Sequence, residues 1–215
     1  MIIFENVFKS FGQKEVLENV NVHLQKGKIY GICGRNGSGK SVFMKLAAGM
    51  LYPTAGEITV NGKRLKKGEF PADTGILMDS VGFLRDQTGY RNLKILAAIL
   101  NKVDDSRIRE VMEMTGLRAD DRTVYGRYSS GMKQKLLLAQ AIMEYPSLLL
   151  LDEPFNALDE ESERRFLSLL CQMNQEYKTT MVIISHDREG LHQICHHLYQ
   201  VKDRTLISDE TGKIV

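Results

Sequence analysis

The sequence predicts an α/β fold with a mostly parallel sheet, into which a helical subdomain is inserted. Apolar runs of strand length alternate with helix-length segments, and two of these runs, Leu148–Leu151 and Thr180–Ile184, are apolar almost throughout. Such runs are typical of parallel strands that are buried on both faces. Between about Thr88 and Tyr145 apolar residues instead recur at helical spacing, which predicts a largely helical segment.

The elements before and after that segment follow from local composition. Strands rich in Val and Ile and bounded by Gly, Asn or Lys are predicted at Met1–Phe8, Val16–Leu24, Ile29–Cys33, Glu57–Val60 and Gly75–Met78. Helices are predicted at Lys40–Met50 and Glu160–Tyr177. Within the helical segment, Asp104–Ser106 would cap a second helix and Gly116 would end it.

Composition and charge limit the class of protein. The 215 residues are 43% hydrophobic and 26% charged, as in an ordinary globular chain, and the net charge of +2 gives no reason to expect a nucleic-acid partner. Three scattered cysteines are typical of a reducing, cytosolic compartment. The N-terminus lacks a signal-peptide pattern, and no apolar run approaches the roughly 18 residues of a membrane span. The chain by itself is therefore expected to be soluble.

A glycine-rich loop follows the predicted strand Ile29–Cys33. Gly34, Gly39, Lys40 and Ser41 fit the phosphate-binding pattern G-x-x-x-x-G-K-[ST]. The backbone N–H groups of such a loop can surround an anion, and the next helix adds the positive end of its dipole. Lys40 would reach the β- and γ-phosphates, and the Ser41 hydroxyl would ligate Mg²⁺. The alternative is a glycine-rich turn that binds nothing.

Two acidic residues follow a later buried strand. Asp152 emerges at the carboxyl end of Leu148–Leu151, where parallel sheets bind their ligands. Asp152 would hold Mg²⁺ directly or through water, and Glu153 would orient or deprotonate an attacking water. The alternative is a strand that ends in two solvated acids, which the phosphate-binding loop in the same chain disfavours.

Two further motifs complete a resemblance to a known family. YSSGMKQK precedes the helix that leads into the strand of Asp152, and IISHD places His186 at the end of the next strand. Together with GRNGSGKS, LLLLDE and NALD, these motifs make the whole chain resemble the nucleotide-binding subunits of ABC transporters. The resemblance implies a P-loop NTPase core with a mostly parallel sheet, an N-terminal antiparallel β-subdomain and an inserted α-helical subdomain. A single domain would span residues 1–215, with 1–87 and 146–215 as β-subdomain and core and 88–145 as the helical subdomain.

The resemblance also implies ATP, Mg²⁺ and the residues that bind them. Subunits of this family form head-to-tail dimers, in which Ser129 and the Gly131 backbone would reach the γ-phosphate held by Lys40 of the partner subunit. An aromatic ring would hold adenine, and Phe11 matches its position best, with Phe8 as the alternative. The expected nucleotide-binding residues are Phe11, Gly34, Arg35, Asn36, Gly37, Ser38, Gly39, Lys40, Ser41, Val42, Ser129, Ser130, Gly131 and Asp159. The expected catalytic residues are Glu153, His186 and Lys40, and the expected metal ligands are Ser41, Asp79 and Asp152.

The chain departs from the family pattern in three places. Val42 stands where many members carry a second hydroxyl residue, so a side-chain contact to the α-phosphate is lost. Ser130 and Met132 replace the first glycine and the glutamine of the LSGGQ signature. Asp79 replaces the glutamine of the Q-loop, although a carboxylate can also ligate Mg²⁺. The surrounding pattern, GILMD and GFLRDQTGYRNLKILAA, resembles the bacitracin-resistance type of exporter ATPase.

The resemblance implies a subunit that dimerises on Mg-ATP and hydrolyses it to drive a separate transmembrane permease. The working dimer would contain either two copies of this chain or one copy together with a related ATPase subunit. It would lie in the cytoplasm, peripheral on the inner face of the cell membrane. Export is favoured because few residues follow His186. The alternative is a soluble ABC-type ATPase in DNA repair or translation, but no sustained heptads indicate the coiled-coil insertion usual there. A signalling GTPase or small kinase would leave Ser129–Met132 and His186 unexplained.

Overall fold

The computed structural model describes residues 2–78 and 82–209. Among these residues one sheet has the strand order β2-β1-β4-β5, and a second has the order β10-β9-β3-β8-β7-β6. The strands are β1 (Ile2–Phe11), β2 (Lys14–Leu24), β3 (Ile29–Cys33), β4 (Ala55–Val60), β5 (Lys63–Arg64), β6 (Thr74–Leu77), β7 (Leu148–Asp152), β8 (Thr180–Ile184), β9 (His197–Lys202) and β10 (Thr205–Ser208). The helices are α1 (Lys40–Ala47), α2 (Gly89–Leu100), α3 (Asp105–Met114), the 3₁₀ turn η1 (Tyr125–Arg127), α4 (Ser130–Ile142), α5 (Glu160–Tyr177) and α6 (Arg188–Ile194).

The second sheet brings the predicted functional strands together. β9, β3, β8, β7 and β6 run parallel, and only β10 pairs antiparallel, with β9. Every residue of β3 and β8 is buried, in agreement with their apolar sequences. Because β8 lies between β3 and β7, the carboxyl ends of these three strands meet at one edge of the sheet.

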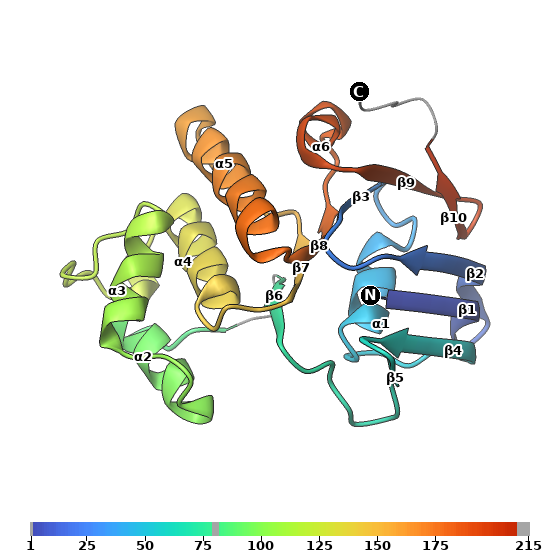
Figure 1. The fold of residues 1–215 in the computed structure, drawn as a ribbon, viewed down its shortest axis with the longest axis horizontal. Coiled ribbons are helices and arrows are strands. Elements are labelled where there is room, and N and C mark those ends of the chain that lie inside the picture. The colour runs from blue at the N-terminus through green and yellow to red at the C-terminus, as the bar shows by residue number, and fades with distance from the viewer. Residues whose placement is uncertain (1, 79–81, 210–215) are drawn as a thin grey trace.

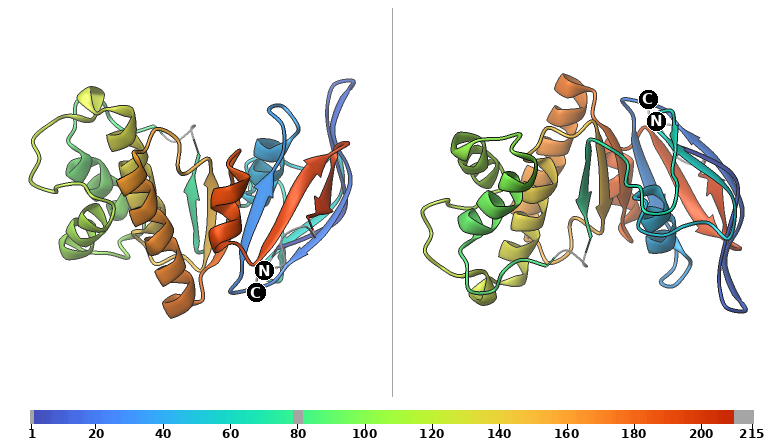
Figure 2. Two further views of the ribbon diagram at one scale, coloured as in Figure 1. Left: turned by 90° about the horizontal axis from the view of Figure 1, so that it is seen from above. Right: turned by 90° about the horizontal axis from the view of Figure 1, so that it is seen from below.

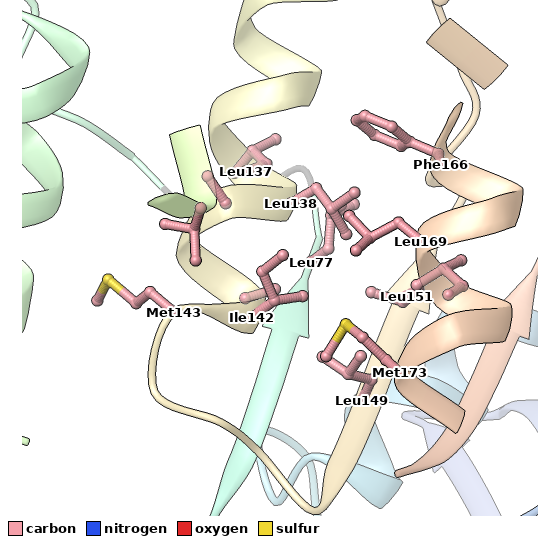
Figure 3. Packing of buried hydrophobic residues seen from close by; sticks show 14 of the residues in the cluster. Leu77, Leu137, Leu138, Ile142, Met143, Leu149, Leu151, Phe166, Leu169 and Met173 are labelled. Carbon is pink, nitrogen blue, oxygen red and sulfur yellow. The ribbon is translucent and has the colours of Figure 1, made fainter. Parts of the chain in front are cut away.

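Helices cover both faces of this sheet, as Figures 1 and 2 show. On one face α4 and α5 pack through Leu138, Ile142 and Leu169 against Leu149 and Leu151 of β7 (Figure 3). On the other face α1 packs together with the antiparallel sheet, which curves around its outer side (Figure 2). Successive residues of β7 point to opposite faces, so one strand supplies both cores.

The antiparallel sheet closes over α1. β1 pairs with β2 on one side and with β4 on the other, and the rings of Phe4 and Phe43 stack with centroids 4.5 Å apart. β1 continues to Phe11, three residues beyond the predicted end, because Phe11 pairs with Lys14 across a two-residue turn. The turn contains Gly12 at φ +59°, a left-handed conformation that suits glycine.

The helical segment differs from its prediction in one part. Asp104 caps α3 by accepting the Arg107 N–H, and Gly116 follows the helix at φ +77°, both as predicted. The chain between α3 and α4, however, is mostly irregular and includes only the short turn η1. The Asp121 carboxylate accepts the Thr123 N–H there, a local bond that competes with helix formation.

Every helix along residues 2–78 and 82–209 is too short or too polar to cross a bilayer.

Candidate nucleotide site

The phosphate-binding loop joins the carboxyl end of β3 to the start of α1. Gly39 precedes the helix at φ +111°, which a residue with a Cβ rarely adopts. A Cβ at this position would lie 3.1 Å from Leu17 Cδ2 and 3.2 Å from the carbonyl oxygen of Val16. Glycine at this position therefore lets the loop lie directly against β2.

Lys40 spans the loop. Its side chain is buried, and its ammonium group donates to the carbonyl oxygens of Gly34 and Arg35 at 2.8 and 3.1 Å. The Ser38 hydroxyl oxygen is shielded from solvent and has no hydrogen-bond partner among the residues that the structure describes. A buried hydroxyl without a partner costs about 1–3 kcal/mol, so a ligand with acceptor oxygens in this loop would remove that cost.

Glu153 follows β7 in a constrained conformation. Its φ of +51° is uncommon for a non-glycine residue and is held by hydrogen bonds on both sides. Its N–H donates to the Ile184 carbonyl oxygen of β8 at 2.9 Å. The Gln134 amide, from α4, donates to the carbonyl oxygens of Glu153 and Pro154 at 3.0 and 2.9 Å. Backbone bonds therefore determine where the Glu153 side chain leaves the sheet.

His186 lies directly beside that carboxylate. Glu153 Oε2 lies 3.0 Å from His186 Nδ1 and accepts the His186 N–H at 3.3 Å. The histidine side chain is 68% exposed, whereas that of Glu153 is 24% exposed. The exposed ring therefore remains open to a ligand.

A cavity of about 690 Å³ lies over the loop and the strand ends. Its walls come from the P-loop, the end of β7, the start of β2 and the turn between β9 and β10. The lining residues are Lys14, Glu15, Val16, Asn36, Gly37, Ser38, Gly39, Lys40, Ser41, Val42, Asp152, Glu153, Asp203 and Arg204. Five of these residues were not among the predicted site residues: Lys14, Glu15 and Val16 of β2, and Asp203 and Arg204 of the β9–β10 turn. Only the folded sheet reveals them, since their sequences carry no phosphate-binding pattern.

The signature segment does not line this cavity within the same chain. Ser129 caps α4, and its hydroxyl oxygen accepts the Met132 N–H at 3.2 Å. Ser130 is the first residue of the helix, and a Cβ on Gly131 would lie 3.0 Å from the carbonyl oxygen of Ala157. Glycine at this position therefore permits the close approach of α4 to the NALD segment.

Asp159 also lies outside the cavity, at the start of α5. Its carboxylate accepts the Ser162 N–H at 2.8 Å and so caps the helix. This hydrogen bond lowers the pKa of Asp159 because it stabilises the charged form.

The remaining predicted residues are less enclosed. Phe11 is 47% exposed, with the Lys9 ammonium 4.8 Å from its ring centroid, and Phe8 is half-buried. Val42, in the first turn of α1, packs at the edge of the core. Asp79 lies outside the described residues. Within the described residues no group of three His, Cys, Asp or Glu side chains could hold a metal by itself.

Comparisons with known proteins assign this architecture to a family. Residues 17–156 match the family model described as "ABC transporter". The bacitracin transport ATP-binding protein BcrA of Enterococcus faecalis is 39% identical over 88% of this chain, which spans 62% of that relative's length. The uncharacterized ABC transporter ATP-binding protein YybJ of Bacillus subtilis is 36% identical, covering 91% of this chain and 89% of the relative. The lantibiotic transport ATP-binding protein SrtF of Streptococcus pyogenes is 31% identical, with 85% and 79% covered.

Solved structures share the fold. The dimeric ABC transporter cassette MJ0796 has a TM-score of 0.86 at 22% identity, with 96% of both chains covered. The post-hydrolysis state of the same cassette, bound to ADP and Pi, has a TM-score of 0.87 at 22% identity, with 97% and 98% covered. The resemblance predicted from the motifs is thus confirmed: the chain belongs to the ATP-binding subunits of ABC transporters, a family of ATP hydrolases.

Proposed function

We propose that this chain binds ATP with Mg²⁺, dimerises head to tail and hydrolyses the ATP to drive export through a separate transmembrane permease. It would act in the cytoplasm, at the inner face of the cell membrane. The observation that carries the proposal is the position of Glu153, oriented by Gln134 and His186, at the edge of the P-loop cavity. Relatives named for bacitracin and lantibiotic transport support the export direction.

Lys40 and the loop would hold the phosphates. The Lys40 ammonium would exchange its two carbonyl acceptors for the more strongly binding phosphate oxygens, and the unpaired Ser38 hydroxyl would donate to the same group. The backbone N–H groups of Asn36 to Val42 would surround the triphosphate at the helix start. Val42 contributes only its backbone, since its side chain carries no donor.

Ser41 and Asp152 would hold Mg²⁺. Both line the cavity, one at the start of α1 and the other at the end of β7. Two protein oxygens suit this ion, which usually completes its shell with water and substrate phosphates. When bound, Mg²⁺ would neutralise charge on the β- and γ-phosphates. Asp79 remains a proposed third ligand on sequence grounds.

Glu153 would accept a proton from the attacking water. A carboxylate at the end of β7, beside the phosphate loop, can reach a water in line with the terminal phosphate. His186 would orient Glu153 through the contact of 3.0 Å and present its exposed ring to the γ-phosphate. Lys40 would stabilise the charge that develops on the phosphate oxygens.

A second subunit would complete the site. Ser129, Ser130 and Gly131 lie outside the cavity of their own chain, and the N–H groups at the start of α4 suit an anion supplied by another chain. The exposed ring of Phe11 would stack on adenine, and Asp159 would lie at the subunit boundary.

Residues 88–145 are proposed as the helical subdomain that meets the permease, while 1–87 and 146–215 bind the nucleotide. A groove of about 410 Å³ runs between α2 and the segment before β6. Phe70, Ile99 and Leu100 line it and are 64%, 72% and 58% exposed. Clustered exposed apolar side chains of this kind are typical of a surface that another protein covers.

A complementation assay tests the shared site. Lys40→Ala disables the P-loop and Gly131→Asp disables the signature, so each variant alone should be inactive. In an equal mixture, half of the dimers would pair the two variants, and each would contain one intact site. ATPase activity should then return to about a quarter of the wild-type rate. An inactive mixture of folded variants would contradict the head-to-tail mechanism.

A further inference from the structure

The turn between β9 and β10 forms one wall of the P-loop cavity, although it lies far from the loop in sequence. Asp203 and Arg204 make this turn and line the cavity beside Lys14, Glu15 and Val16 of β2. Figure 1 shows the β9–β10 hairpin next to β2. The Glu18 N–H donates to the Arg204 carbonyl oxygen at 2.8 Å and joins the two elements.

Both central residues of the turn have positive φ, and the strain lies at the second one. Asp203 and Arg204 have φ of +48° and +65°. Two-residue turns with two positive φ values favour Asn-Gly or Asp-Gly, so Arg204 occupies a position that suits glycine. Strain of this kind persists where surrounding contacts impose it, and it is concentrated at functional sites.

Two carboxylates of β2 orient the Arg204 side chain. Its Nη1 lies 2.8 Å from Glu15 Oε2, and its Nη2 lies 3.0 Å from Glu18 Oε2. The side chain is half exposed and lines the cavity, and the two pairs set the direction of the guanidinium at the cavity edge. An arginine presents fixed N–H donors together with a flat face that can stack on a ring.

The charges of the cavity indicate which part of ATP lies there. Lys40, the loop amides and Ser41 favour the phosphates at the other wall. The wall of β2 and the β9–β10 turn carries Lys14 and Arg204 beside Glu15 and Asp203, so its charges balance and it lacks the excess of positive groups that favours phosphate at the other wall. An uncharged nucleoside suits such a wall. We propose that Arg204 is a nucleoside-binding residue, whose guanidinium, oriented by Glu15 and Glu18, contacts the ribose and base of bound ATP. This inference rests on the proposed function, in which the P-loop cavity binds ATP.

Calorimetry on the full chain with three ligands tests the proposal. Arg204→Gly should raise the Kd of Mg-ATP and Mg-ADP alike by about three- to tenfold, the size expected for one hydrogen bond lost at a half-exposed site. The Kd of inorganic tripolyphosphate, which lacks a nucleoside, should not rise. An unchanged Kd for ATP, or an equal rise for all three ligands, would overturn the proposal.

Matched variants separate binding from stability. Glycine relieves the strained φ, so Arg204→Gly should not lower the melting temperature. The matched control is Arg118→Gly, which removes an exposed arginine paired with Asp120. This variant should leave the Kd of all three ligands unchanged. If Arg204→Gly fails to fold, the double variant Glu15→Gln with Glu18→Gln decides the question. This variant keeps Arg204 but removes the two carboxylates that orient it. It should raise the Kd of ATP without raising the Kd of tripolyphosphate. ATP binding equal to wild type in that variant would overturn the proposal, whereas failure of the wild-type chain to bind ATP would instead contradict the proposed function.

Discussion

The P-loop cavity and the signature segment differ in how the fold holds them. The cavity lies where three buried parallel strands end; hydrogen bonds within one chain hold Lys40 to its loop and Glu153 to β8 and α4. The signature segment Ser129–Gly131 lies at the start of α4, where the Ser129 hydroxyl accepts the Met132 N–H and its carbonyl oxygen accepts the Lys133 N–H, and these bonds tie the segment to its own helix. The phosphate end of the site is therefore formed within one chain, whereas its other half would come from the second subunit of the proposed dimer.

One side chain connects the two regions. Gln134 belongs to α4, one turn after the signature, yet its amide donates to the backbone of Glu153 and Pro154. Movement of the signature helix would therefore be transmitted to the carboxylate that is proposed to activate water. The four predictions below test this contrast, from the largest expected effect to the smallest.

Glu153→Gln should remove hydrolysis while leaving ATP binding intact. Loss of a general base costs about 10²- to 10⁴-fold in rate, whereas the amide keeps the shape and the contact to His186. Single-turnover ATPase measurements, together with gel filtration in Mg-ATP, should show an inactive chain that accumulates as a dimer. Glu161→Gln on the exposed side of α5 is the matched control and should keep wild-type activity. A Glu153→Gln enzyme with more than a tenth of the wild-type rate would exclude this residue as the base.

Gln134→Leu should disconnect the two regions. The substitution leaves two carbonyl oxygens without their donor, so we expect a loss of about 2 kcal/mol in unfolding free energy. ATP hydrolysis should fall by about tenfold because the strained Glu153 backbone loses its support. Denaturant unfolding and steady-state ATPase rates measure the two effects.

The Gln134 prediction has its own control. Gln172→Leu on α5 removes an amide whose bond, to Glu176, lies on the surface, and it should change neither quantity. If Gln134→Leu lowers stability but leaves the rate unchanged, the bridge is structural and does not couple the signature helix to Glu153.

Most of the phosphate end was predictable from the sequence, because its residues are contiguous and follow apolar strands. The pattern around Lys40 and the Asp152–Glu153 pair each directly follow an apolar run, so the sequence alone predicts that they lie at strand ends. Gln134, Glu15 and Arg204 were not predictable, because their contacts join segments that are distant in the chain. The irregular stretch after α3 was predicted as helical because apolar spacing ignores competing side-chain bonds such as that of Asp121.

Ser129→Ala should affect the signature region alone. Loss of the hydroxyl cap of α4 should lower the unfolding free energy by about 1 kcal/mol. The Kd of a single chain for ATP, measured at dilution, should stay unchanged, while the rate at high protein concentration should fall. Ser147→Ala, whose hydroxyl donates to the Asp73 carbonyl oxygen away from the helix start, is the control. A raised Kd for the isolated chain would mean that the two regions are not independent before dimerisation.

The smallest expected effect is that of pH on the stability of β3, the strand that carries the P-loop. His196 Nδ1 accepts the Ile29 N–H at 3.0 Å, at the start of β3, and a proton on that nitrogen would break the bond. Burial lowers the pKa of His196 below its usual value, and Lys28 lowers it further. The unfolded chain therefore takes up a proton at a higher pH than the folded chain, so the stabilising bond is fully present above about pH 6.5 and is lost as the pH falls toward the lower folded pKa.

Hydrogen exchange can resolve this effect by region. As the pH falls from 7 to 5, protection of the Ile29 amide should decrease, after correction for intrinsic exchange, while amides within α4 keep theirs. His196→Asn should abolish the pH dependence at Ile29, and His23→Asn on exposed β2 should not. Equal loss of protection in β3 and α4 would mean that acid destabilises both regions together. The phosphate end and the signature segment would then not be stabilised independently of each other, and the contrast between them would be wrong.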